Sequence, residues 1–174
     1  MKKIVSSFLL ILSVIFLSCC DSTFTKREIK GLSDPKNYKE YNVVFYEIKT
    51  IEDASSINNK DTLLYVTFQT LEELNEFMTT PVTEGSDINA YKISFVINQN
   101  NNKILTGSSF YNDIKQGDQF KVIVSNFKNA YSTKYFWVAS LEYNGKTYLN
   151  FETGMNNIKA FLNEHQSPWF NSGK

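Results

Sequence analysis

Apolar side chains at every second position are the feature that most restricts how this chain can fold. Phe120, Val122 and Val124, for example, are separated by single residues, of which Lys121 is charged. A period of two places the apolar side chains of a strand on one face of a sheet. We therefore expect about seven strands, over residues 41–49, 62–69, 91–97, 103–111, 120–125, 135–143 and 147–151.

Turn signals between these segments indicate that neighbouring strands run antiparallel. Residues 99–102 (QNNN) are typical of a turn, which would join strands 91–97 and 103–111 as a hairpin. Residues 114–118 form a second turn, with Gly117 available for a positive φ. Asn144-Gly145 is the strongest hairpin signal in the chain.

Two helices are expected, one between the strands and one after them. Thr70 and Glu73 have the spacing of a capping box, in which the Thr70 oxygen caps the Glu73 backbone and the Glu73 carboxylate reaches back. Apolar residues spaced for one helix face follow in both segments. They are Leu71, Leu74, Phe77 and Met78 in the first helix, and Met155, Ile158, Phe161 and Leu162 within residues 153–165.

The order of these elements predicts an α+β fold. We expect a mostly antiparallel, strongly curved sheet or a small barrel of about seven strands, with two short helices. The segment Pro168-Trp169-Phe170 follows the last helix, and we expect it to fold back onto the domain, because an exposed tail with two large aromatic residues would be a liability.

The N-terminus has the organisation of a secretory signal. Lys2 and Lys3 precede an apolar run, Ile4–Leu17, that only serines interrupt. The run has about 14 residues, whereas a membrane-spanning helix needs about 20. It ends in FLSCC, and a strongly polar segment follows at once.

A small residue next to a cysteine, directly after such a run, resembles the lipobox of bacterial lipoproteins. The resemblance implies that signal peptidase II cleaves before the cysteine, which then carries a diacylglyceryl thioether and an N-acyl chain. Cys19 follows Ser18 and is the favoured site, with Phe16 at position −3. Cys20, with Leu17 at −3, is the alternative. A lipobox with Phe at position −3 resembles those of spirochaetal lipoproteins.

We therefore divide the chain into a signal peptide (residues 1–18), a lipidated N-terminus with a flexible tether (19–40) and one globular domain (41–174). The tether is expected because residues 21–40 are polar and lack a clean period. Both cysteines lie in the lipobox. The exported domain therefore has no disulfide and depends on packing.

Charge gives little reason to expect a nucleic-acid partner. Loss of Lys2 and Lys3 with the signal leaves 16 basic and 18 acidic residues, a formal net charge of −2. Such a chain has no strong field to attract a polyanion. The predicted contact with the membrane is through the covalent lipid.

Residues suited to catalysis are scarce. His165 is the only histidine, and we expect it to bond a carbonyl at the end of the last helix or to face water. A Cys-His pair and a multi-histidine metal site are excluded, and no Gly-x-Ser-x-Gly elbow occurs. A glycosidase pair among distant carboxylates stays open. We predict a non-enzymatic protein with no catalytic residue, metal or cofactor.

Aromatic residues are the one excess, with 14 Phe, 10 Tyr and 2 Trp. Many gather around the hairpin 135–148, where β-sheet packing is the first explanation. The alternative is a binding surface, formed either by the aromatic stripe or by the opposite face of the strand. The candidate residues are Tyr135, Phe136, Trp137, Val138, Tyr143 and Tyr148.

The leading hypothesis is a lipid-anchored binding domain in the bacterial cell envelope, on the surface or the periplasmic face of the outer membrane. Its partner would be a protein, a host ligand or an envelope component. One alternative is a carrier that holds a small apolar ligand in a pocket of the curved sheet. The other is a periplasm-facing assembly factor.

Overall fold

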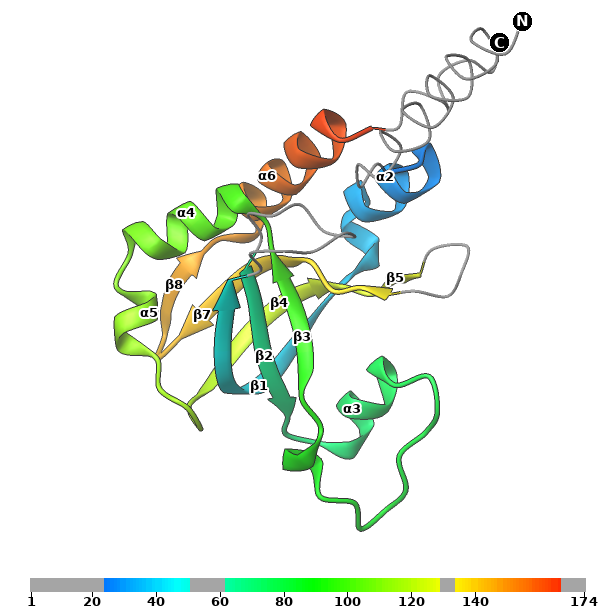
Figure 1. Ribbon diagram of the computed structural model, residues 1–174, viewed down its shortest axis with the longest axis vertical. Coiled ribbons are helices and arrows are strands. Elements are labelled where there is room, and N and C mark those ends of the chain that lie inside the picture. The colour runs from blue at the N-terminus through cyan, green and yellow to red at the C-terminus, as the bar shows by residue number, and fades with distance from the viewer. Residues whose placement is uncertain (1–23, 51–61, 129–133, 167–174) are drawn as a thin grey trace, which may run out of the picture.

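The computed structural model describes residues 24–50, 62–128 and 134–166 (Figure 1). Its centre is a six-stranded antiparallel sheet with the strand order β3-β2-β1-β4-β7-β8. The strands are β1 (Tyr38–Thr50), β2 (Thr62–Phe68), β3 (Ile93–Ile97), β4 (Gln119–Ser125), β7 (Val138–Tyr143) and β8 (Lys146–Leu149). A short ribbon of β5 (Phe127–Lys128) and β6 (Lys134–Tyr135) extends beyond it.

Five α-helices and two 3-10 turns surround this sheet in the described residues. The α-helices are α2 (Lys26–Ser33), α3 (Leu71–Phe77), α4 (Gln99–Gly107), α5 (Phe110–Asp113) and α6 (Phe151–Glu164). The 3-10 turns are η2 (Pro35–Asn37) and η3 (Ile88–Ala90). The predicted α+β class and the antiparallel sheet are confirmed. The predicted number of helices, two, is too low, because the described residues form five.

The sheet is strongly bent but open, so the predicted alternative of a barrel is wrong. β1 pairs with both β2 and β4, and an extra residue, Tyr46, bulges out of its pairing with β2. Such bulges bend and twist a strand. The sheet curls until the Val96 N–H donates to the Phe136 carbonyl at 2.9 Å, an isolated bridge. The edge strands β3 and β8 do not pair with each other.

The expected strand 103–111 is instead two helices, α4 and α5. The Asn98 side chain accepts a hydrogen bond from the Asn101 N–H at 2.9 Å and so caps α4. Asparagine is favoured both in turns and as a helix N-cap. The asparagine cluster at residues 98–102 therefore begins helix α4 and does not form the expected turn.

Asn101 also ties three elements together. Its side chain is fully buried, and its Nδ2 donates to the carbonyls of Val138 (3.1 Å) and Gly154 (3.4 Å). Its Oδ1 accepts from Asn157 Nδ2 at 2.8 Å. A buried amide with both ends bonded satisfies buried backbone groups. It therefore fixes α4 against β7 and α6.

The expected flexible tether is folded from Phe24 onward. Thr25 and Glu28 form a capping box at the start of α2, and Leu32 on this helix is completely buried. The Phe24 N–H donates to the His165 carbonyl at the end of α6, at 2.8 Å. Residues 24–40 therefore belong to the domain. The signal segment, both cysteines and the Pro168–Phe170 segment lie outside the described residues.

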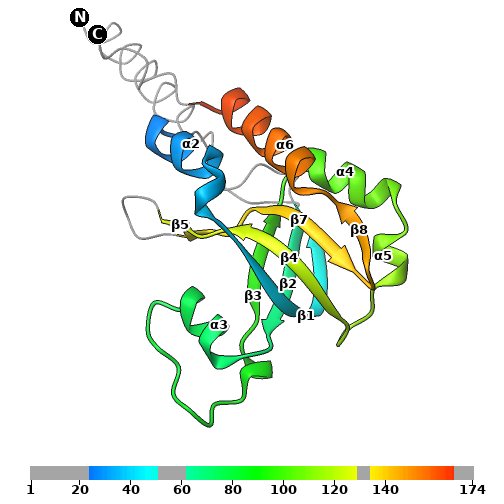
Figure 2. The ribbon, with the colours of Figure 1, turned by 180° about the vertical axis from the view of Figure 1, so that it is seen from behind.

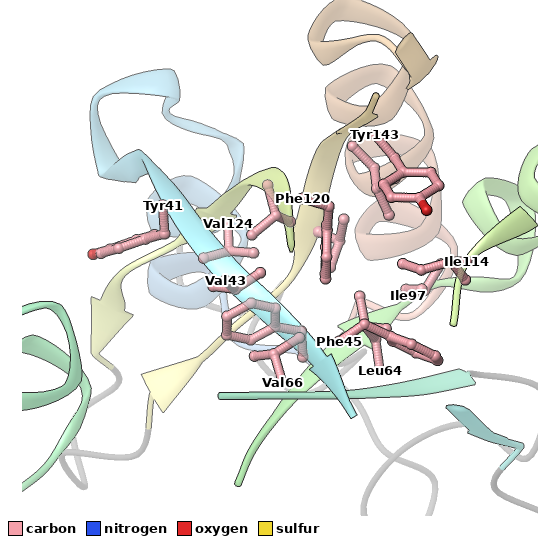
Figure 3. Packing of buried hydrophobic residues seen from close by; sticks show 14 of the residues in the cluster. Tyr41, Val43, Phe45, Leu64, Val66, Ile97, Ile114, Phe120, Val124 and Tyr143 are labelled. Carbon is pink, nitrogen blue, oxygen red and sulfur yellow. The ribbon is translucent and has the colours of Figure 1, made fainter. Parts of the chain in front are cut away.

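Two hydrophobic clusters occupy opposite faces of the sheet. The larger one fills the concave side, where side chains from β1 to β4 point toward one another (Figure 3). The smaller one lies under α2 and α6 and includes Leu32, Trp137 and Ala139. The predicted stripe of residues 135–143 is split between them. An extra residue in β7, Ala139, shifts the register opposite Ile123 and Val124, so Trp137 and Leu141 face different cores.

Several local predictions are confirmed. Asn144 and Gly145 both have positive φ, 51° and 73°, as a tight hairpin turn requires. Gly117 has a φ of 92°. The Thr70 oxygen caps the Glu73 N–H at 3.1 Å, whereas Glu73 Oε2 is buried and bonds none of the described residues, so only half of the predicted capping box forms. The last predicted helix is α6, capped by Asn150.

We expect Gly154→Ala to destabilise the protein. A Cβ at this position would lie 1.9 Å from the Ala139 carbonyl oxygen, and backbone cannot move aside as a side chain can. The overlap should cost about 1–3 kcal/mol of unfolding free energy, which exceeds the gain in helix propensity. Urea unfolding measures it. Gly107→Ala is the control, because no atom lies within 4 Å of its Cβ position. Equal stability of the two variants would contradict the close contact.

Candidate functional site

The aromatic residues proposed as a binding surface are mostly core residues. Trp137, Val138, Tyr143 and Tyr148 are between 0% and 9% exposed. Phe136 packs against the large cluster, with its ring centroid 4.4 Å from that of Phe77. Tyr135 lies in β6, at the end of the ribbon. The described side chains of this set therefore stabilise the sheet and do not form one exposed surface.

The hydroxyl groups of two of these tyrosines fasten the β7–β8 hairpin. Tyr143 donates to Asp118 Oδ2 at 2.6 Å, and Tyr148 donates to Asp113 Oδ2 at 2.8 Å. Ser109 also donates to Asp113, at 2.5 Å. The pKa of Asp118 is lowered, first by the Tyr143 bond and then by the Lys115 N–H. The pKa of Asp113 is lowered, first by Ser109 and then by Tyr148. Carboxylates held ionised in this way are poor bases, and their role here is structural.

His165 stands where the sequence placed it, at the end of α6. Its Nδ1 lies 2.8 Å from the Phe161 carbonyl oxygen, and its ring stacks on Phe161 at 4.2 Å. In the part of the chain that the structure describes, no group of three His, Cys, Asp or Glu residues has the geometry to hold a metal ion.

A polar hollow of about 410 Å³ lies where β1, β2 and β4 meet η3. Val44 of β1 and Gln119 of β4 are direct partners across the two strands, and Gln69 follows β2. The hollow thus lies at the middle of β1, where the end of β2 and the start of β4 meet that strand, and η3 covers its side. It is lined by Val44, Phe68, Gln69, Ser86, Asp87, Ile88, Asn89 and Gln119.

Local bonds hold the covering loop in place. Asp87 Oδ1 accepts from the Asn89 N–H at 3.0 Å and so caps η3. Asn75 of α3 bonds both backbone groups of Val82, at 2.6 and 3.3 Å. Ile88 packs against the large core. The position of η3 is therefore determined by capping and by apolar contacts.

The lining of the hollow is rich in side chains that form hydrogen bonds. The amides of Gln69, Asn89 and Gln119 can each donate and accept hydrogen bonds. Asp87 supplies one carboxylate, and Val44 contributes apolar surface. The described lining has no histidine, cysteine or lysine, and Ser86 supplies its one hydroxyl.

The surroundings of the hollow are acidic. Residues 71–90, which we call the α3–η3 segment, contain five carboxylates and neither lysine nor arginine. Glu76 is engaged by Lys39 and by the Tyr41 hydroxyl, the latter at 2.8 Å. Burial and then this bond raise the pKa of Tyr41.

Two lysines lie close by: Lys92 Nζ is 3.5 Å from the ring centroid of Tyr46 in β1, and Lys121 is on the same face of β4 as Gln119. The α3–η3 segment therefore supplies a negative field on one side of the hollow.

The sequence did not point to this hollow. Its residues come from positions 44 to 119, and the register of β1 with β2 and β4, together with the packing of η3, brings them together. The one local signal was Asp87 two residues before Asn89, an arrangement that caps a turn.

No family model, curated protein or solved structure matches this chain. Among the described residues, no helix is long and apolar enough to cross a membrane.

We expect Tyr143→Phe to raise the pKa of Asp118 toward the ordinary aspartate value of about 3.9, and to leave Asp113 unchanged. Tyr148→Phe should shift Asp113 by less, because its Ser109 bond is the larger cause. NMR titration of the carboxyl carbons measures both pKa values.

A lowered carboxyl pKa stabilises the fold above about pH 4, and this stabilisation is lost as the pH falls through the lowered pKa. Shifts that did not follow the mutated partner would disprove the pairing.

Proposed function

We propose that this chain is a lipid-anchored protein of the bacterial cell envelope that binds a basic peptide segment of a partner protein, without catalysis. The observation that carries the proposal is the hollow beside η3, with three side-chain amides and one carboxylate in its lining. Its volume of about 410 Å³ is within the range of small ligand sites, about 300–1,000 Å³.

The lining chemistry matches an extended peptide. Peptide N–H and C=O groups need partners that both donate and accept, and Gln69, Asn89 and Gln119 meet this need. A lysine or arginine of the ligand can pair with Asp87, whose Oδ2 bonds no other described residue. The carboxylates of the α3–η3 segment add a field of the same sign.

The alternative of an apolar carrier has less support. It needs an empty apolar interior on the concave side of the sheet. That side is occupied by packed rings, such as Phe77 against Phe68 at 4.6 Å and against Phe136 at 4.4 Å between centroids. The hollow itself is polar and lies beside the middle of β1, next to η3.

A short peptide with one lysine flanked by alanines, capped at both ends, is the probe for this proposal. We expect it to shift the NMR signals of the Gln69, Asn89 and Gln119 side-chain amides. Asp87→Asn should weaken binding by up to roughly fivefold, the range for an exposed ion pair. Asp34→Asn is the control, because Asp34 caps η2 with a 3.0 Å bond as Asp87 caps η3.

The same peptide with glutamine in place of lysine separates the contribution of the ion pair with Asp87 from that of the hydrogen bonds to the side-chain amides. It should bind more weakly to the unmodified protein and should be insensitive to Asp87→Asn. Shifts spread over the whole surface, or equal effects of Asp87→Asn and Asp34→Asn, would show that the hollow is not a peptide site.

The proposed anchor has its own test. In cells fed an alkyne-labelled palmitate, the protein should carry the label, and Cys19→Ser should abolish it while Cys20→Ser keeps it. Loss of label only in Cys20→Ser would place cleavage one residue later. Label in neither the unmodified protein nor the variants would refute the anchor and leave the hollow untouched.

A further inference from the structure

The folded domain begins very close to the proposed lipid. Phe24 is five positions after Cys19 and four after Cys20. Five residues span at most about 18 Å even when fully extended. Phe24 is held by the His165 carbonyl and packs in the smaller core. If the anchor of the proposed function is correct, on which this inference rests, Phe24, two residues before helix α2, lies within that distance of the bilayer.

That helix, α2, has a basic exposed face. Lys26, Arg27 and Lys30 are exposed, whereas Gly31 and Leu32 on the other side are buried against α6 and Phe127. Residues four apart lie on the same side of a helix. Within the described residues, none of these three cations forms an ion pair.

Few carboxylates oppose these charges at this end of the molecule. Glu28 accepts hydrogen bonds from the Thr25 N–H and hydroxyl at 2.9 and 2.8 Å, within its capping box. Glu164 is exposed at the end of α6. Asp34, the C-cap of α2, is exposed too, and the exposed Lys36 follows it. Four cations against three carboxylates leave a net charge of +1 on the face that the anchor brings to the membrane.

The opposite end of the domain carries the opposite charge. Both views place α2 and the end of α6 at one end of the molecule, and α3 with the loop that follows it at the other (Figures 1 and 2). The α3–η3 segment has five carboxylates and no basic residue. An anionic surface therefore attracts one end and repels the other, which orients the domain.

We propose that the face formed by Lys26, Arg27 and Lys30 docks on the anionic lipid headgroups of the bilayer that holds the anchor. The lipid confines the domain to the membrane, and the basic face sets its orientation. The hollow beside η3 then points away from the bilayer, toward a partner.

The contribution of each cation follows from membrane electrostatics. A lysine or arginine at an anionic surface improves binding by roughly fivefold, so three give on the order of a hundredfold. The attraction falls off within the Debye length, about 10 Å at 0.1 M salt. The docked state must therefore be sensitive to lipid charge and to salt.

Hydrogen exchange on the lipidated protein in vesicles tests the docking. Full-length precursor is expressed, and the product is purified from membranes, checked by mass for acyl chains and reconstituted. We expect the amides of α2 to exchange several-fold more slowly in vesicles that contain phosphatidylglycerol than in phosphatidylcholine alone. Added salt should remove the difference.

A charge-neutral variant and a matched control complete the design. Lys26→Gln, Arg27→Gln and Lys30→Gln together should abolish the lipid-dependent protection. Lys103→Gln, Lys115→Gln and Lys121→Gln together remove the same charge from exposed positions on other elements and should keep it.

The outcomes separate this inference from the proposed anchor. An absence of acyl chains in the mass would refute the anchor and, with it, the docking. Acylated protein whose α2 exchanges equally in both vesicles would overturn the docking alone. If α2 exchanged more slowly in both kinds of vesicle than in solution, and equally in the two, it would contact another copy or an apolar surface, and this result too would overturn the docking.

Discussion

The close approach of α6 to β7 is the constraint on which the rest of the fold depends. Gly154 leaves no room for a Cβ above the Ala139 carbonyl, and Asn101 bonds the carbonyls of Val138 and Gly154 on either side of this contact. An interior without disulfides needs such shape and hydrogen-bond complementarity, because apolar burial alone does not select one arrangement. The contact fixes the helix that in turn receives α2.

The bulge at Ala139 lets one strand serve both cores. Leu141 faces the concave cluster and Trp137 faces the cluster under α6, although the two residues are an even number of positions apart. With both faces of β7 covered, its aromatic residues are needed for packing. The proposed peptide site therefore lies away from β7, beside the loop that carries η3.

The sequence predicted those elements whose signals are local. Alternating apolar residues predicted β4 correctly, and the dipeptide Asn144-Gly145 predicted the turn of the β7–β8 hairpin, because both patterns act over a few residues. The cluster at 98–102 misled because asparagine suits a turn and a helix cap equally. Residues 26–33 are too polar to indicate a packed helix until α6 supplies a surface for Leu32. The hollow is a product of strand register, which no single segment contains.

The pairing of the two ends of the described chain has a mechanical consequence. Phe24 forms an isolated bridge with Gln166 at the end of α6. A pull transmitted through the N-terminus loads this bridge and the α2–α6 contact before it reaches any strand of the main sheet. The bridge and α2 therefore detach first, while the sheet and the hollow at the other end of the molecule keep their shape under tension.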